Sequence, residues 1–446
     1  MSEHDTDAQV SEAQRAALEL ANVEEADRNA ALQAIADAIR ANSEAILEAN
    51  AADVEEAEAM LAEGEYTQAL VDRLKLDESK LESIAEMVES VAGQDDPLGA
   101  TLQARELDED LELYKVAVPI GVVGTIFESR PDALVQIASL SLKSGNAVIL
   151  KGGSEAAESN RVLYETILEA TAEVGAVPDG WAKLIEAHAE VDALLEMDDK
   201  VDLLMPRGSS EFVSYIQDNT QIPVLGHTEG LCHVFVDEAA DLEMAADIAV
   251  DAKVQYPAVC NAVETLLVEE SVAEEFLPAV VDRYESEGVT LRGCERTRDH
   301  VDIDPVREDD WEQEYGDLEL SIKVVEDVYA AVDHVNTYGS KHTESIVTED
   351  AETAERFMTG IDAASVFHNA STRFADGYRY GLGAEVGIST GKIHARGPVG
   401  LDGLTTYKYY LEGDGHLVAT YAGEDALPFT HREFDGEWSP GRHHEE

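Results

Sequence analysis

Apolar residues at helical spacing dominate the first part of the chain. Between residues 11 and 61, Leu32, Ile35, Ile39 and Ile46 follow one another at intervals of three, four and seven positions, in a background rich in Ala and Glu. This spacing brings the four side chains to one face of a helix. We therefore predict amphipathic helix, in two or three pieces, over this region.

Short apolar runs that alternate with turn residues come next. Residues 112–127 contain Pro-Ile-Gly and predict two strands with a bend between them. Strands are also expected at 147–150 and 201–205, each leading into a helix, and a further helix is expected at 133–142. Strands and helices in this order predict a parallel α/β sheet of the dinucleotide-binding type, although no Gly-x-Gly-x-x-Gly follows any strand.

The second half of the chain continues the alternation. The Tyr-rich segment 404–412 predicts a strand that suits an oligomer edge. From Glu424 onward the chain is acidic and contains Pro and Gly, so we expect a mobile tail. The other expected elements are helices at 242–254, 273–285 and 324–338 and strands at 264–268 and 364–368.

The charge of the chain is unusual for its size. The 446 residues include 94 Asp and Glu against 31 Lys and Arg, which gives a net charge of −63. The acids are spread over many solvent faces, as in 55–64, and this indicates a surface adapted to a salt-rich cytoplasm. Such a surface repels nucleic acid and anionic lipid, so we expect neither as a partner.

The first ten residues carry no basic and apolar leader, and the longest apolar stretch, 116–127, is too short to span a bilayer. Three cysteines, Cys232, Cys260 and Cys294, cannot form a disulfide framework and indicate a reducing compartment. We expect a cytoplasmic protein.

Cys260 is the main candidate for chemistry. It stands in Tyr-Pro-Ala-Val-Cys-Asn, where a loop meets an apolar run. A thiolate at this point can act as a nucleophile if a base or its surroundings activate it. A buried structural thiol is the alternative, and for a lone cysteine it is the more common one. The turn 206–210, which joins a strand to a helix, suits phosphate binding or packing alone.

Seven blocks of sequence together resemble one family, the γ-glutamyl phosphate reductases of the aldehyde dehydrogenase superfamily. The resemblance runs from about Ala16 to Gly415 and does not cover the tail or the acidic surface. The blocks are Y-P-A-V-C-N-A-V-E-T-L-L-V, V-P-I-G-V-V-G-T-I-F-E-S-R-P, L-K-S-G-N-A-V-I-L-K-G-G-S-E-A, L-M-P-R-G, H-V-N-T-Y-G-S-K-H-T-E-S-I-V-T-E-D, N-A-S-T-R-F-A-D-G and G-L-G-A-E-V-G-I-S-T-G-K-I-H-A-R-G-P-V-G-L.

The resemblance implies an aldehyde-dehydrogenase-like α/β fold and a homo-oligomer. It implies an NADPH-binding domain (1–106 and 120–224, with 375–400 returning to it), a catalytic domain (225–374) and a β oligomerisation arm (107–119 and 401–423), followed by the tail (424–446).

The implied reaction is the NADPH-dependent reduction of γ-glutamyl phosphate to glutamate 5-semialdehyde in proline biosynthesis, with glutamate 5-kinase as a possible donor of the substrate. Cys260 would form a thioester, and the backbone N–H groups of Cys260 and Asn261, with Ser129, would meet the oxyanion. The water-activating Glu-Leu-Gly-Gly-Lys motif of aldehyde dehydrogenases is absent, and Leu-Gly-His-Thr-Glu-Gly stands in its place. His227 in this turn would contact phosphate or carry a proton, or only stabilise the turn.

The resemblance also implies binding residues. Two arginines would clamp the carboxylate and phosphate ends of the substrate, and their assignment to the two ends stays open. For Glu314, a surface acid without a binding role is the alternative. No metal site is expected, and the turn Gly339-Ser-Lys-His-Thr receives no chemical role. The cofactor residues are Lys151, Gly208, Ser209 and Glu314, and the substrate residues are Arg130, Asn369, Ser371 and Arg373.

Two other functions remain open at this point. One is an oxidising semialdehyde dehydrogenase, and the other is a catalytically idle scaffold of the same fold. The missing glutamate motif argues against the first, and the presence of Cys260 and Lys151 argues against the second.

Overall fold

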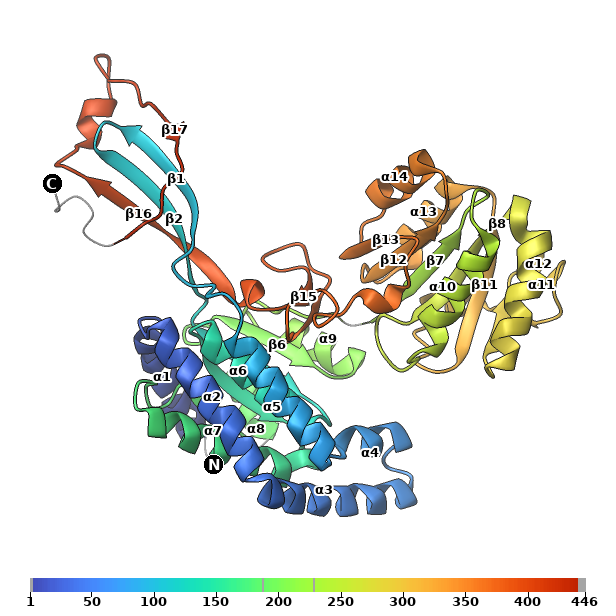
Figure 1. Cartoon of the computed structure of the whole chain (residues 1–446), viewed down its shortest axis with the longest axis horizontal. Coiled ribbons are helices and arrows are strands. Elements are labelled where there is room, and N and C mark those ends of the chain that lie inside the picture. Colours follow the sequence, from blue (N-terminus) through green and yellow to red (C-terminus); the bar gives the residue numbers. More distant parts are fainter. Residues whose placement is uncertain (1–2, 187, 228, 440–446) are drawn as a thin grey trace. The chain divides into compact units, whose positions relative to one another are not determined.

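The computed structural model describes residues 3–186, 188–227 and 229–439 (Figure 1). The chain forms two compact units. Unit 1 comprises residues 1–208, 219–224 and 400–446, and unit 2 comprises residues 209–218 and 225–399. None of the helices in the described ranges combines the length and the apolar composition that a membrane span requires.

Five helices open unit 1, and the first three lie in the region where the apolar spacing predicts helix in two or three pieces. In the second of them, Leu32, Ile35 and Ile39 are fully buried on one face. Thr67 and Asp77 accept backbone N–H bonds at the starts of the fourth and fifth helices, and Gly64 ends the third in the left-handed conformation. The helices are α1 (Glu3–Leu20), α2 (Glu25–Ala41), α3 (Ser43–Glu63), α4 (Gln68–Leu74) and α5 (Glu78–Ala92).

A parallel four-stranded sheet of order β5-β4-β3-β6 forms the centre of unit 1. Both central strands are buried along their whole length, as expected for a parallel sheet covered by helices. Asp53 accepts the N–H groups of Glu158 and Ser159 and so fixes the start of a covering helix. The elements are β3 (Val122–Phe127), α6 (Pro131–Lys143), β4 (Ala147–Gly152), η1 (Ser154–Ala156), α7 (Ala157–Val174), β5 (Ala182–Ile185), α8 (His188–Leu195) and β6 (Leu203–Arg207).

An antiparallel sheet of order β16-β2-β1-β17 forms the arm of unit 1 (Figure 1). It begins at Thr101, six residues before the start that the sequence suggested. The elements are β1 (Thr101–Asp108), β2 (Leu111–Pro119), η4 (Asp402–Leu404), β16 (Thr405–Gly413), η5 (Val418–Tyr421) and β17 (Arg432–Glu433).

The tail differs from the mobile segment that we expected. Over residues 424–439 it returns to the arm, where β17 pairs with β1. The Trp438 ring stacks on Tyr410 at 4.0 Å between centroids, and its Nε1 donates to Glu412 at 3.2 Å. Phe434 packs edge-on against Tyr114. The aromatic residues of this acidic tail therefore attach it to the arm. The expectation of a mobile tail rested on its acidic residues, Pro and Gly and did not consider these aromatic residues.

Unit 2 is built on a parallel seven-stranded sheet of order β10-β9-β11-β8-β7-β12-β13. Its strands are β7 (Cys232–Val236), β8 (Val263–Glu269), β9 (Thr290–Gly293), β10 (Asp304–Pro305), β11 (Glu319–Val325), β12 (Thr343–Val347) and β13 (Ser365–His368), with a separate hairpin of β14 (Gly387–Ser389) and β15 (Gly397–Val399). Its helices are α9 (Ser210–Asn219), α10 (Leu242–Val254), α11 (Glu270–Ser286), α12 (Glu295–Arg298), η2 (Glu308–Glu312), α13 (Val328–Tyr338), α14 (Ala351–Gly360) and η3 (Thr372–Phe374).

The domain prediction needs two further corrections. Residues 375–399 belong to unit 2, not to the cofactor domain. Two hydrogen bonds hold this segment there: Asn261 Nδ2 donates to the carbonyl of Ala375 at 2.8 Å, and His227 Nδ1 donates to the carbonyl of Ile388 at 3.0 Å. Residues 209–218 also cluster with unit 2.

Candidate active site

The amino ends of three neighbouring strands in unit 2 carry the candidate chemistry. The sheet order β8-β7-β12 makes these strands adjacent and parallel. Cys260 precedes β8, the turn from Gly226 to Gly230 precedes β7, and His342 directly precedes β12. Segments that are far apart in the sequence therefore meet at one edge of the sheet.

Cys260 lies in a tight turn and is partly exposed. The turn is closed by the N–H of Ala262, which donates to the carbonyl of Val259 at 2.9 Å. Among the residues that the structure describes, the N–H groups of Cys260 and Asn261 find no hydrogen-bond acceptor. Two adjacent unused donors beside a thiol can stabilise an oxyanion that forms on the carbon attacked by the sulfur.

The backbone of Gly230 packs so closely against the backbone of Cys260 that position 230 requires glycine. A Cβ at this position would lie 2.2 Å from the carbonyl oxygen of Cys260 and 2.4 Å from its Cα. Only glycine permits so close an approach of the two backbones. The adjacent Leu231 N–H donates to Ser340 Oγ at 2.8 Å, which ties the third segment to the other two.

Two histidines stand beside Cys260. Its sulfur and one ring nitrogen each of His227 and His342 all lie within 4.8 Å of one another. The two rings meet edge-on, with 5.2 Å between their centroids. His342 was not predicted to have a chemical role, although the Gly-Ser-Lys-His-Thr turn that carries it belongs to the resemblance.

The hydrogen bonds of the histidines show which ring nitrogens are already engaged. A carbonyl cannot donate, so the Nδ1 of His227 carries the proton in its bond to Ile388, and in the neutral ring Nε2 is the basic nitrogen. His342 is buried, and its Nδ1 contacts Thr343 Oγ1 at 2.9 Å and Cys232 Sγ at 3.7 Å. Its Nε2 is buried and has no hydrogen-bond partner among the described residues.

Arg373 is the most informative of the predicted substrate residues. Its side chain is 7% exposed, and its Nε donates to Gln255 Oε1 at 3.0 Å. Within the described ranges it forms no ion pair with a carboxylate, in a chain of 94 acidic residues. Burial, and then the nearby Arg379, lower its pKa, whereas the charges of Asp376, and then of Cys260 and Asp251, raise it. A buried guanidinium near Cys260 is thus left to bind an anion.

Three other predicted side chains of unit 2 have structural partners. The Asn261 amide donates to Ala375, so only the backbone of Asn261 is directed to the proposed chemistry. The Asn369 amide accepts the N–H of Thr348 and donates to its carbonyl, both at 3.0 Å. Ser371 Oγ accepts the N–H of Arg373 at 3.3 Å and so helps to form the turn that carries this arginine.

The predicted residues of unit 1 lie where its sheet ends. Lys151 on β4 is 4% exposed, and its Nζ donates to the carbonyl of Gly152 at 2.7 Å; burial lowers its pKa. Ser129 is buried, and its hydroxyl donates to Glu155 at 2.8 Å, so this hydroxyl already has an acceptor in unit 1. The Arg130 side chain is half exposed, and its Nη2 lies 3.7 Å from Asp132 Oδ2.

The remaining cofactor residues flank α9 and η2. Gly208 follows β6, and Ser209 caps α9: its carbonyl accepts the N–H of Val213 at 3.0 Å. Glu314 is half-buried. The pKa of Glu229 is raised first by the burial of Glu229 and then by the negative charge of Glu314. Glu314 therefore lies near the turn before β7.

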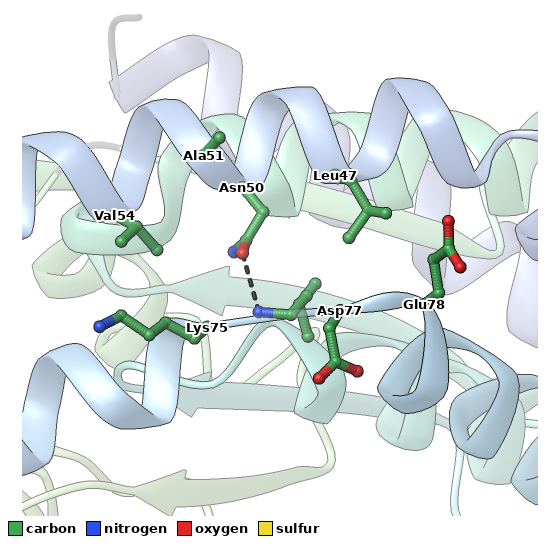
Figure 2. Close-up of a pocket in the computed structure, with 8 residues that line it drawn as sticks. Leu47, Asn50, Ala51, Val54, Lys75, Asp77 and Glu78 are labelled. Atoms are coloured by element: carbon green, nitrogen blue, oxygen red, sulfur yellow. Dashed lines mark hydrogen bonds between the residues drawn. The ribbon is translucent and has the colours of Figure 1, made fainter.

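A hollow of about 590 Å³ in unit 1 holds none of the predicted site residues. Figure 2 shows it between α3 and the segment after α4, lined by Leu47, Val54 and Lys75 among others. Asn50 there accepts the N–H of Leu76 at 2.8 Å and donates to the carbonyl of Leu74. Asn50 thus fixes the path of the chain, and we assign no ligand to this hollow.

Comparison with known proteins agrees with the predicted fold and family. The sequence profile of the Aldehyde dehydrogenase family matches residues 1–310. The chain therefore belongs to the aldehyde dehydrogenase family, and the predicted fold class is confirmed.

Within that family, the chain belongs to the γ-glutamyl phosphate reductases. It is 72% identical over 437 residues to the γ-glutamyl phosphate reductase of Natronomonas pharaonis, with 98% of this chain and 99% of the relative covered. The predicted resemblance is confirmed.

Solved structures agree. The crystal structure of γ-glutamyl phosphate reductase from Thermotoga maritima matches with a TM-score of 0.89 and 42% identity, over 92% of this chain and 99% of that one. A glyceraldehyde-3-phosphate dehydrogenase from Methanocaldococcus jannaschii, solved with NADP, matches with a TM-score of 0.67 and 16% identity, over 93% of this chain and 95% of that one, and shows the fold alone.

Proposed function

We propose that this chain reduces γ-glutamyl phosphate to glutamate 5-semialdehyde and phosphate, through a thioester on Cys260. Its membership of the γ-glutamyl phosphate reductases gives the reaction. The observation that carries the residue assignment is the arrangement around Cys260. Two histidines lie beside the thiol, and within the part of the chain that the structure describes two backbone donors next to it are unused and a nearby buried arginine has no carboxylate partner.

The chemistry begins with the loss of the thiol proton. We assign its acceptance to Nε2 of His227, the basic nitrogen of the tautomer that Ile388 fixes. The thiolate attacks the acyl carbon, the C–O bond to phosphate breaks, and phosphate leaves with the bonding electron pair. The N–H groups of Cys260 and Asn261 donate to the oxyanion in this step and again when the thioester is reduced.

The nicotinamide cofactor, when bound, supplies the hydride that converts the thioester to the aldehyde. Lys151 fits a dinucleotide with an extra phosphate, because a buried ammonium without a carboxylate partner in the described chain needs an anion. This favours NADPH over NADH. Gly208 and Ser209 would meet the pyrophosphate at the start of α9, and Glu314 would meet the nicotinamide ribose.

Arg373 is the principal substrate residue in this proposal. Its guanidinium suits the phosphate or the α-carboxylate equally, and Arg130, which is half exposed, would take the other end. Ser371 supports Arg373 by accepting its backbone N–H. We assign Asn369 to the scaffold of this loop because its side-chain oxygen and its side-chain nitrogen are both hydrogen-bonded to the backbone of Thr348. Ser129 stays a candidate donor only if its bond to Glu155 exchanges.

We further propose a homo-oligomer in the cytoplasm, supplied with its labile substrate by glutamate 5-kinase. Three large apolar or aromatic side chains of β16 support the oligomer, since Tyr407, Tyr409 and Leu411 are each about half exposed. The −63 charge and the absence of a disulfide framework fit a salt-rich, reducing cytoplasm.

The reverse reaction tests the function. Glutamate 5-semialdehyde and NADP⁺ should give NADPH over many turnovers only when phosphate is present, in a buffer of molar KCl. Cys260→Ala should abolish turnover and keep NADPH binding, while the matched Cys294→Ala should retain turnover. Continuous NADPH formation without phosphate, beyond one equivalent per Cys260, would support the oxidising dehydrogenase instead, and no activity at any salt concentration would support the scaffold.

A further inference from the structure

We propose that Cys260, His227 and His342 form a binding site for a thiophilic divalent metal ion, with Zn²⁺ as the natural fit, and that the ion holds the enzyme in a reversibly inactive state. The sulfur and the two ring nitrogens all lie within 4.8 Å of one another. One thiolate and two imidazoles are the ligand types that zinc prefers.

The geometry is close to what zinc requires. Tetrahedral bonds of about 2.0 Å to nitrogen and 2.3 Å to sulfur put the ligand atoms about 3.3 to 3.6 Å apart. The three atoms therefore need to approach by little more than 1 Å, which a rotation of the partly exposed Cys260 and His227 side chains can provide. Three protein ligands leave the fourth position to water.

His342 supplies independent support for a ligand at this point. It is 1% exposed, and no residue that the structure describes hydrogen-bonds to its Nε2. A buried polar atom without a partner is costly, and a metal ion would satisfy it. Its Nδ1 is already engaged by Thr343 Oγ1, so Nε2 is the atom left to bind.

The outer contacts match those of metal-binding histidines. Such histidines usually donate their second ring N–H to a carbonyl or another oxygen, which fixes the ring and the tautomer. His227 does this through the carbonyl of Ile388 at 3.0 Å, and His342 contacts the Thr343 hydroxyl at 2.9 Å. The sequence gives no sign of the site, because the three residues are 33 and 82 positions apart.

Binding has a defined consequence for the reaction. The thiol of Cys260 loses its proton to solvent as the sulfur–metal bond forms, and the sulfur pair is then no longer available to attack an acyl carbon. Removal of the ion by a chelator restores the thiol. The site is thus inhibitory and goes beyond the proposed reaction.

Cobalt absorption tests the site without any turnover. CoCl₂ is titrated into chelator-treated full-length protein in molar KCl, and the near-ultraviolet thiolate-to-cobalt band and the visible bands of tetrahedral cobalt are followed. We expect one equivalent with both sets of bands, displaced by ZnCl₂. Cys260→Ser should lose the thiolate band, and His342→Asn or His227→Asn should weaken metal binding by about ten-fold or more. Cys294→Ser and His416→Asn serve as matched controls and should bind as the parent does.

Three results would overturn the proposal: no thiolate band in the parent protein, a band that survives in Cys260→Ser, or unchanged affinity in both histidine variants. Cobalt bound by surface histidines alone would lack the thiolate band and would count against the site. Zinc should also stop NADPH turnover, with recovery on addition of EDTA. If the chain proved to have no turnover, the cobalt spectra would still decide on the metal site, so the two failures can be told apart.

Discussion

Replacement of Arg373 by lysine tests the substrate site most sharply. The variant keeps the positive charge but loses the planar fork and the bond to Gln255 Oε1. A hydrogen bond to a charged group contributes about 1.5 to 3 kcal/mol. At 1.36 kcal/mol per factor of ten, the loss of one such bond weakens binding of the anion by about 10- to 150-fold.

The reverse reaction shows which end of the substrate Arg373 binds. Phosphate and glutamate 5-semialdehyde are varied separately, since one carries the phosphate and the other the α-carboxylate. We expect the KM of one of them to rise by the factor above, while the KM of the other and that of NADP⁺ stay within about three-fold of the parent values.

The control is Arg379→Lys, because Arg379 lies in the same region but has a carboxylate partner, Asp376, at 3.4 Å. Its kinetic constants should stay close to those of the parent. If Arg373→Lys left both KM values unchanged, or lowered only the melting temperature, the unpaired guanidinium would be a structural feature and our reasoning would be wrong.

Three further predictions concern packing, pH and salt. Gly230→Ala should lower kcat by about 100-fold or more, because the added Cβ would displace the Cys260 backbone by about 1 Å. The control Gly391→Ala should keep the parent kcat, because its Cβ would meet only Ser389 Oγ, at 3.5 Å. Equal kcat values for the two variants would refute the role of the close approach at Gly230. Burial lowers the pKa of His334 to about 2, so the neutral ring's contribution to the free energy of unfolding is complete above pH 6.5 and is lost as the pH falls below that value. His334→Gln should reduce the slope of the unfolding free energy against pH by about 1.4 kcal/mol per pH unit, measured in denaturant titrations at fixed salt. An unchanged slope would contradict this assignment. The net charge of −63 should make the melting temperature rise between low and molar KCl, and a constant value would argue against a halophilic surface.

Much of the fold follows from local patterns. The helix expected at 242–254 is α10, with the same bounds, because its Ala-rich buried face and the cap at Asp241 are both visible in the sequence. β11 was missed: the apolar residues at 324–338 suggested one helix, whereas β11 ends at Val325 and α13 starts at Val328. Where a short apolar strand is followed within a few residues by a helix, the spacing of apolar residues does not show where the strand ends and the helix begins.

The site was predictable only in part. Cys260 and Arg373 stand in motifs that point to their chemistry, but no local pattern joins His342 to Cys260. Their proximity depends on the pairing of β7 with both β8 and β12, which is a long-range property of the sheet. The close approach of Gly230 to the Cys260 backbone depends on the same pairing.

The most direct test of the account is a search for the thioester itself. The protein is incubated with glutamate 5-semialdehyde and NADP⁺ without phosphate, quenched in acid, and analysed by mass spectrometry of the intact chain and of its peptides. We predict one γ-glutamyl adduct on the peptide that contains Cys260, lost when phosphate is added before the quench and absent in Cys260→Ala. NADPH formation without an adduct, or an adduct that persists in Cys260→Ala, would contradict the mechanism.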